Sequence, residues 1–164
     1  MNGVSVTRDT YRMMAPVPED VLGMPAEGEG EWAVWHGVTC TPADGRNAVV
    51  LVSIAVTAFH PREPADDELA ARLRDRHPEC GTCIEEFVTA DGNPAVSVRR
   101  VVTRRVNGRD VTTGQAQALV AYPDAQALGV VSALALDPGD LGRAAELVTG
   151  IAAGMTVTGA PAAA

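Results

Sequence analysis

The sequence predicts an α+β fold in which a single, mostly antiparallel sheet has helices packed on it. Three observations lead to this prediction. A long β-branched run, AVVLVSIAVTAF at residues 48–59, is typical of a buried central strand. The dipeptides Asp91-Gly92 and Asn107-Gly108 are those that tight hairpin turns prefer. Residues 66–77 and 141–155 carry apolar side chains at helical spacing.

The composition is that of one globular domain. A chain of 164 residues is long enough to bury a core without metal or disulfide support. Its apolar content of 46% and charged content of 21% are ordinary for folded proteins. Because aromatic residues make up only 4% of the chain, aliphatic side chains must fill the core.

The sequence divides into an arm, a domain and a tail. Residues 1–31 are rich in proline, glycine and acidic residues, so we expect an N-terminal arm, partly irregular, in which residues 10–14 could add a short strand. Residues 32–158 are expected to form the single α+β domain. Residues 159–164 (GAPAAA) are expected to be a flexible tail.

The first half of the domain is predicted to contain two strands and a helix. Residues 32–39 (WAVWHGVT) form the first strand and residues 48–59 the second, with the turn residues CTPADGRN between them. The helix at residues 66–77 begins with three acidic residues and carries its arginines towards its end, which suits the helix dipole. Pro78 ends it.

The second half is predicted to be an antiparallel meander followed by a closing helix. Tight turns separate its four strands, which are residues 83–89, 95–106, 111–122 and 127–136. The helix at residues 141–155 follows, with Asp140 as its N-cap.

This order of elements resembles the PsbP-like fold, an α/β/α sandwich. The resemblance covers roughly residues 11–157 and is carried by AVVLVSIAVTAF, DDELAARLRDRH, EEFVTADGNPAVSVRR and PGDLGRAAELVTGIAAGM. It is a likeness of element order and turn placement. Because few members of that fold are enzymes, the resemblance implies a non-enzymatic binding or accessory role, and it assigns no functional residue.

Charge and hydropathy restrict the partners. A net charge of −8 disfavours binding to nucleic acid and to anionic membranes. The N-terminal segment has no apolar signal-peptide core, and no stretch approaches the ~20 apolar residues of a membrane span. We therefore expect a cytoplasmic protein with no membrane or nucleic-acid partner and no cofactor.

Cys80 and Cys83 form a C-x-x-C pair, the most function-like motif of the chain. A redox role needs an easily formed thiolate, which a helix N-terminus favours. Here the pair follows the C-terminal end of a predicted helix and has Glu79, Glu85 and Glu86 beside it, and both features favour the protonated thiol. We therefore expect two ordinary thiols at a turn, with a reversible disulfide left open.

A metal site is the alternative interpretation of the pair. A structural zinc ion needs four ligands, so two more would have to come from Cys40 or the three histidines, His36, His60 and His77. The alternative site consists of Cys80, Cys83, His36 and Cys40. The spacing of these residues does not specify such a site.

Five arginines follow one predicted strand and its turn: Arg99, Arg100, Arg104, Arg105 and Arg109. If these arginines have a function, they would bind phosphate or an acidic partner. The predicted register instead places Glu85 and Glu86 beside residues 97–100, and Asp110 near Arg105. We therefore expect at least two of the first four arginines to pair with carboxylates of the same sheet.

Trp32 and Trp35 are three residues apart, so on a strand they point to opposite faces. One is expected in the core. The other is expected to be an exposed interface anchor or to be covered by the N-terminal arm.

No catalytic motif is present, and no serine sits in a nucleophile elbow. The predicted function is therefore a non-enzymatic protein-binding or accessory domain that acts through its sheet surface or edge. The candidate contact residues are Trp32, Trp35, Arg99, Arg100, Arg104 and Arg105. The partner is another protein, and self-association stays open. The alternative is a metal- or ligand-binding module built on the Cys80/Cys83 turn.

Overall fold

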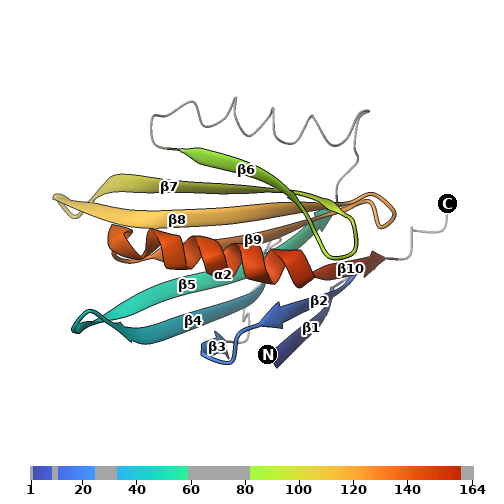
Figure 1. Cartoon of the computed structure of the whole chain (residues 1–164), viewed down its shortest axis with the longest axis horizontal. Helices are drawn as coiled ribbons and strands as arrows, with labels where there is room; N and C mark the ends of the chain where they lie inside the picture. Colours follow the sequence, from blue (N-terminus) through green and yellow to red (C-terminus); the bar gives the residue numbers. More distant parts are fainter. Residues whose placement is uncertain (1, 9–10, 25–32, 59–81, 160–164) are drawn as a thin grey trace.

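The computed structural model describes residues 2–8, 11–24, 33–58 and 82–159 (Figure 1). Strands dominate this part of the chain, and one α-helix, α2 (Leu141–Gly154), follows a short 3-10 turn, η1 (Pro138–Asp140). The strands are β1 (Asn2–Arg8), β2 (Tyr11–Val17), β3 (Val21–Met24), β4 (Ala33–Ala43), β5 (Arg46–Ala58), β6 (Cys83–Val88), β7 (Pro94–Val106), β8 (Arg109–Tyr122), β9 (Ala127–Ala135) and β10 (Thr156–Gly159).

The strands form two antiparallel sheets. A seven-stranded sheet has the order β3-β4-β5-β9-β8-β7-β6, and a three-stranded sheet has the order β1-β2-β10. The prediction of a single sheet is therefore wrong. The N-terminal segment, expected to be a partly irregular arm with one possible short strand, contributes three strands between residues 2 and 24. Strand β10 follows α2 directly, where no strand was expected. The small sheet was missed because β2 pairs with β10 from the other end of the chain, a contact that no local pattern reveals.

The four-strand meander and the closing helix are confirmed. Strands β6 to β9 and α2 begin and end within a few residues of their predicted limits, and the α+β class holds. Asn107 (φ 50°) and Gly108 (φ 78°) both have positive φ, which the expected tight turn requires. The helix predicted at residues 66–77 lies outside the described residues.

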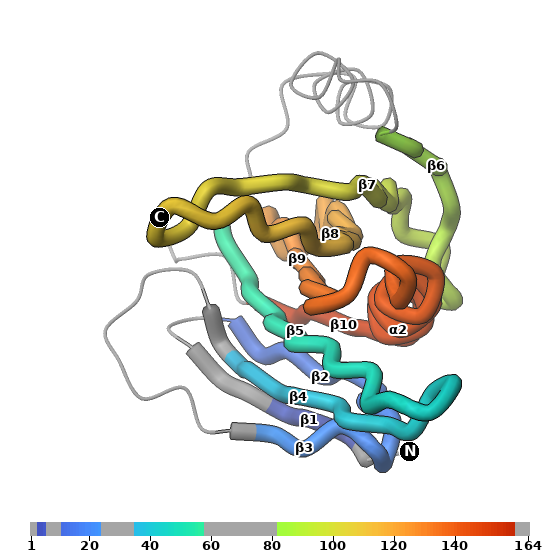
Figure 2. Tube along the Cα trace, turned by 90° about the vertical axis from the view of Figure 1, so that its left-hand side faces the viewer, coloured from blue at the N-terminus to red at the C-terminus, as the bar shows by residue number. Residues whose placement is uncertain are grey.

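One face of the seven-stranded sheet carries the main core. Helix α2 and the three-stranded sheet lie against this face, as Figure 2 shows for α2 and β10. Every second residue of β9 points into it, which gives the strict alternation of burial along that strand. The core is aliphatic, as the composition predicts, and its largest fully buried side chains include Met13, Ile54, Ile151 and Met155.

Asp140 occupies the N-cap position of α2, as predicted, but its side chain makes no capping hydrogen bond. Its carboxylate instead accepts two hydrogen bonds from the Arg46 guanidinium, at 2.7 and 2.9 Å. Asp137 provides the local cap by accepting from the backbone N–H of Gly139 at 2.7 Å. The Arg46–Asp140 pair therefore ties the β4–β5 hairpin to the start of the helix.

We expect the Asp140→Asn variant to be less stable than the wild type at neutral pH. The hydrogen bonds from Arg46 lower the pKa of the Asp140 carboxyl. A lowered folded-state pKa stabilises the protein above the unfolded value of about 3.9, and this contribution is lost as pH falls through the folded-state value. Denaturation midpoints of the two proteins should therefore converge in acid. Asp124→Asn, at an exposed turn, is the control, and an equal effect of both substitutions at neutral pH would contradict the prediction.

Candidate functional site

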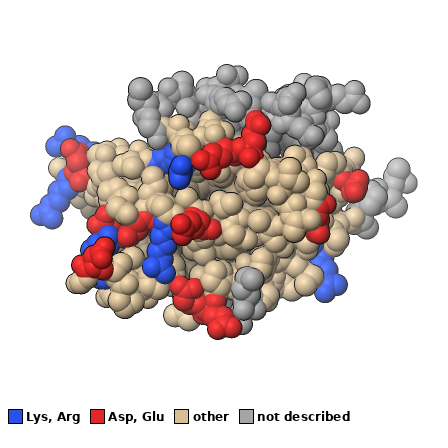
Figure 3. Space-filling model, in the orientation of Figure 1, with Lys and Arg blue, Asp and Glu red and all other residues tan. Residues whose placement is uncertain are grey.

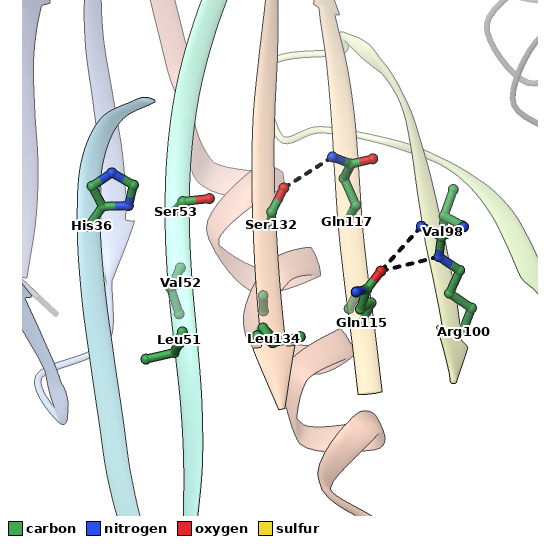
Figure 4. Close-up of a pocket in the computed structure, with 12 residues that line it drawn as sticks. His36, Leu51, Val52, Ser53, Val98, Arg100, Gln115, Gln117, Ser132 and Leu134 are labelled. Atoms are coloured by element: carbon green, nitrogen blue, oxygen red, sulfur yellow. Dashed lines mark hydrogen bonds between the residues drawn. The ribbon is translucent and has the colours of Figure 1, made fainter. Parts of the chain in front are cut away.

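The face of the seven-stranded sheet opposite α2, called the far face here, carries two adjacent rows of side chains. A polar row crosses four neighbouring strands, because the register pairs His36 with Ser53, Ser53 with Ser132, and Ser132 with Gln117. Directly paired residues point to the same side of a sheet. These four polar side chains therefore stand in one line across the sheet (Figure 4).

An apolar row runs beside the polar one. It crosses β3, β4, β5 and β9 at Leu22, Val38, Leu51 and Leu134. Leu22 is 69% exposed and Leu51 43% exposed, so part of this row is open to solvent. On β8 and β7 the same line continues into polar residues, Gln115 and Arg100.

A groove of about 400 Å³ lies where the two rows meet. This volume is in the range of small-ligand and peptide-anchor sites. Its lining combines aliphatic side chains with hydroxyl, amide, imidazole and guanidinium groups, and none of the lining residues is acidic. Another part of the far face is closed, because Val96, Val98 and Leu119 form a small buried cluster there.

Hydrogen bonds between neighbouring strands orient the polar side chains of the groove. Gln117 Nε2 donates to Ser132 Oγ at 3.1 Å. Arg100 Nε and Nη2 donate to Gln115 Oε1 at 3.3 and 3.2 Å. A guanidinium can only donate hydrogen bonds, so the side-chain oxygen of Gln115 must face Arg100. The amide N–H groups of Gln115 therefore point elsewhere. The groove therefore presents fixed polar groups beside aliphatic ones.

Within the described part of the chain, the groove holds no assembled serine nucleophile. His36 and Ser53 are opposite each other in the register, but no hydrogen bond joins their side chains in the described part of the chain. A serine nucleophile needs such a base, and the base needs a third group, often a carboxylate, to orient it. Among the described residues, no carboxylate lines this groove.

The arginines of β7 alternate between the two faces of the sheet. Arg99 and Arg105 point to the α2 side, while Arg100 and Arg104 point to the far side, as their register with β8 requires. Arg99 pairs with Glu85 at 3.4 Å, and Arg105 donates to the Gly108 carbonyl at 3.4 Å. The expected register is confirmed, since Asp110 is opposite Arg105 and Glu85 opposite Ser97. The expectation of two carboxylate pairs among the four stays a prediction.

Trp35 packs under the N-terminal segment. Its ring covers Gly23 of β3 and Gly37 of β4, and a Cβ atom at either glycine would collide with it. The side chain is half-buried against the core. Trp35 therefore packs against the protein instead of offering a free anchor, and Trp32 lies outside the described residues.

The structure separates the described members of the alternative metal site. His36 and Cys40 lie on β4, and Cys83 lies on β6, with four strands between them. Neighbouring strands of a sheet are about 4.8 Å apart, so β4 and β6 are separated by about 24 Å across the sheet. Cys83 is in contact with Arg99 and Glu85, and Cys80 lies outside the described residues. Within the described ranges, no three His, Cys, Asp or Glu side chains are placed to hold a metal ion.

Sequence reasoning missed most of the groove. His36 was considered only as a metal ligand, and Ser53, Ser132, Gln115 and Gln117 were not considered. A signal does exist, because each of these polar residues lies within a strand at a position that faces away from the core. A polar residue in the middle of a sheet strand marks a solvated or binding face.

Comparison with known proteins shows the fold of the chain. No family model and no curated protein matches the sequence. Among solved structures, the chain is similar to LpqN, a protein of Mycobacterium tuberculosis described as involved in cell envelope biogenesis. The TM-score is 0.58 over 96% of this chain and 91% of the other, at 16% sequence identity. At that identity the likeness concerns the fold alone.

No helix in the described part of the chain is long and apolar enough to cross a membrane.

Proposed function

We propose that this chain is a non-enzymatic binding domain of PsbP-like type that contacts a partner protein through the far face of its seven-stranded sheet. One observation carries the proposal: a solvent-open apolar row runs beside a groove with fixed polar groups. Protein interfaces combine an apolar centre with a polar surround. The groove residues come from strands of one hydrogen-bonded sheet, so the surface is rigid before binding, which lowers the entropic cost of association.

The lack of acidic side chains among the described lining residues supports a binding role further. Although the chain has a net charge of −8, the described residues that line the groove include arginine and histidine but no carboxylate. A partner segment can therefore bring apolar and hydrogen-bonding groups into the groove without meeting like charges. No described residue of the groove is an oriented nucleophile, so the surface supports recognition better than it supports turnover.

Capture of partners with two matched surface variants tests the proposal. Leu51→Asp places a charge in the apolar row, and Met14→Asp makes the same change at an equally exposed position on the three-stranded sheet, since Leu51 is 43% and Met14 49% exposed. Both variants should fold, because neither side chain belongs to the core. We expect a protein from the native host to be captured by the wild type and by Met14→Asp but not by Leu51→Asp.

The comparison is decisive in both directions, once circular dichroism has shown that all three proteins are folded. If all three capture the same proteins, the far face is not the contact surface. If Met14→Asp alone loses the partner, the three-stranded sheet is the interface and the proposal is wrong.

A further inference from the structure

The β7–β8 hairpin extends beyond both of its neighbours in the sheet. Pairing of β6 with β7 ends at Cys83 opposite Arg99, and pairing of β9 with β8 ends at Ala135 opposite Gly114. Residues 101–106 of β7 and 109–113 of β8, called the arm here, therefore pair only with each other within the described part of the chain. Figure 1 shows this hairpin projecting past the end of α2.

Among the described residues, no strand pairs with the outer edge of the arm. The turn at Asn107-Gly108 has two residues, so Val106 and Arg109 form the hydrogen-bonded pair that closes the hairpin. Hydrogen-bonded and non-hydrogen-bonded pairs alternate along the hairpin from that pair onwards. The N–H and C=O groups of Val101, Thr103 and Arg105, which belong to non-hydrogen-bonded pairs, therefore point away from β8. Such an edge is a template for one more strand.

The side chains of the arm combine arginine with exposed valine. Three arginines and one acidic residue lie on it: Arg104, Arg105, Arg109 and Asp110. Three of its valines are exposed to solvent: Val101 is 52%, Val106 51% and Val111 43% exposed. Arg104, Val106, Arg109 and Val111 share one face. Figure 3 shows arginine atoms gathered at the end of the molecule where Figure 1 places this turn.

We propose that the arm is a docking element for an extended, acidic segment of a partner protein, which adds as a strand to the free edge of β7. Backbone hydrogen bonds would supply affinity, and the alternating arginines and valines would select acidic and apolar side chains on the added strand. The local charge is positive in a chain of net charge −8, so it attracts an acidic partner and repels a second copy of the same arm.

This inference rests on the proposed function in taking the partner to be a protein, but it uses a different surface. An experiment can therefore reject this inference without rejecting the proposed function, and the reverse is also true. Leu51→Asp, which should remove partner capture through the far face, should leave the arm and its peptide binding unchanged.

The probe is a short, capped peptide of alternating glutamate and valine that carries a fluorophore, and its binding is followed by fluorescence anisotropy. We expect binding that weakens as salt is raised, because exposed charges are screened. The double variant Arg104→Glu/Arg109→Glu should lower affinity at least about tenfold, since like charges then face the peptide. Arg12→Glu, an exposed charge reversal on β2, should not lower it.

Substitution of Thr103 separates strand addition from simple charge attraction. Thr103→Pro removes an outward N–H that β8 does not use, and edge strands tolerate proline at such positions. Thr103→Val loses the same hydroxyl, which lies 2.8 Å from that of Thr112, but keeps the N–H. We expect Thr103→Pro to abolish peptide binding and Thr103→Val to keep it. A peptide N-methylated at alternate residues makes the same test without altering the protein, and it should not bind.

Three results would overturn the proposal. The acidic peptide could fail to bind at low salt. It could bind equally well to Thr103→Pro and in its N-methylated form, which would make the contact purely electrostatic. The wild type could also self-associate in sedimentation experiments in a way that Thr103→Pro removes, which would make a second copy the occupant of the edge.

Discussion

The Ile151→Ala variant is expected to lose about 2–5 kcal/mol of unfolding free energy, the usual cost of emptying a fully buried aliphatic site. Ile151 is 1% exposed and lies on the face of α2 that meets the seven-stranded sheet. The core cluster that contains Ile151 includes residues of that sheet and of the three-stranded one. Strands on both sides hold the helix in place, so the surroundings cannot collapse easily into the cavity.

Urea denaturation of the wild type and two α2 variants measures this effect. Glu146→Ala, on the exposed side of the same helix, is the matched control and should change stability by no more than about 0.5 kcal/mol. The slope of the transition should stay the same for both variants, since the surface exposed on unfolding hardly changes. A loss below about 1 kcal/mol for Ile151→Ala would show that α2 is not a tightly packed part of the core.

The elements that the sequence predicts correctly are those with local signals. Asn107-Gly108 forms the expected two-residue turn and so sets the register of β7 and β8. Asp91-Gly92 also marks a turn, but it lies in a longer connection, residues 89–93, between β6 and β7. The closing helix has apolar side chains at helical spacing and Asp140 at its N-cap position. In each case the residues that determine the element lie within it.

The elements that sequence reasoning missed depend on distant partners. Strand β2 contains Pro16 and is followed by Pro18 and acidic residues, so its local pattern indicates irregular structure. It is a strand because Met13, Ala15 and Val17 enter the core beside α2, and because β10 supplies hydrogen bonds from the other end of the chain. Tertiary context overrides local propensity there.

The groove could not be derived for a similar reason. Its polar row exists only because Ser53 of β5 is opposite Ser132 of β9, a register between strands far apart in the sequence. A shift of one residue would turn Ser132 to the other face. The polar residues are visible in the sequence, but their alignment is a property of the sheet.

The Gly129→Ala variant is expected to lose about 1–3 kcal/mol, the cost of adding a methyl group to a filled core. Gly129 lies on β9 facing the end of α2, where an added Cβ would collide with the Met155 side chain and lie 3.0 Å from the Tyr122 ring. Neither neighbour can move away easily. Met155 is 1% exposed, and the Tyr122 hydroxyl donates a 2.8 Å hydrogen bond to the Met155 carbonyl. Burial raises the pKa of Tyr122, so this hydroxyl stays protonated and the bond persists at ordinary pH.

Gly150→Ala is the matched control for this prediction, because it has the opposite expected sign. Gly150 lies within α2 with open space around its Cα, so alanine should stabilise the helix by about 0.5–1 kcal/mol. Combining Gly129→Ala with Met155→Ala extends the test, since the new methyl group would then fill part of the vacated space. The double variant should therefore lose less than the two single losses added together. Additive losses would mean that Met155 does not fill the space above Gly129, and that the glycine is needed for some reason other than this contact.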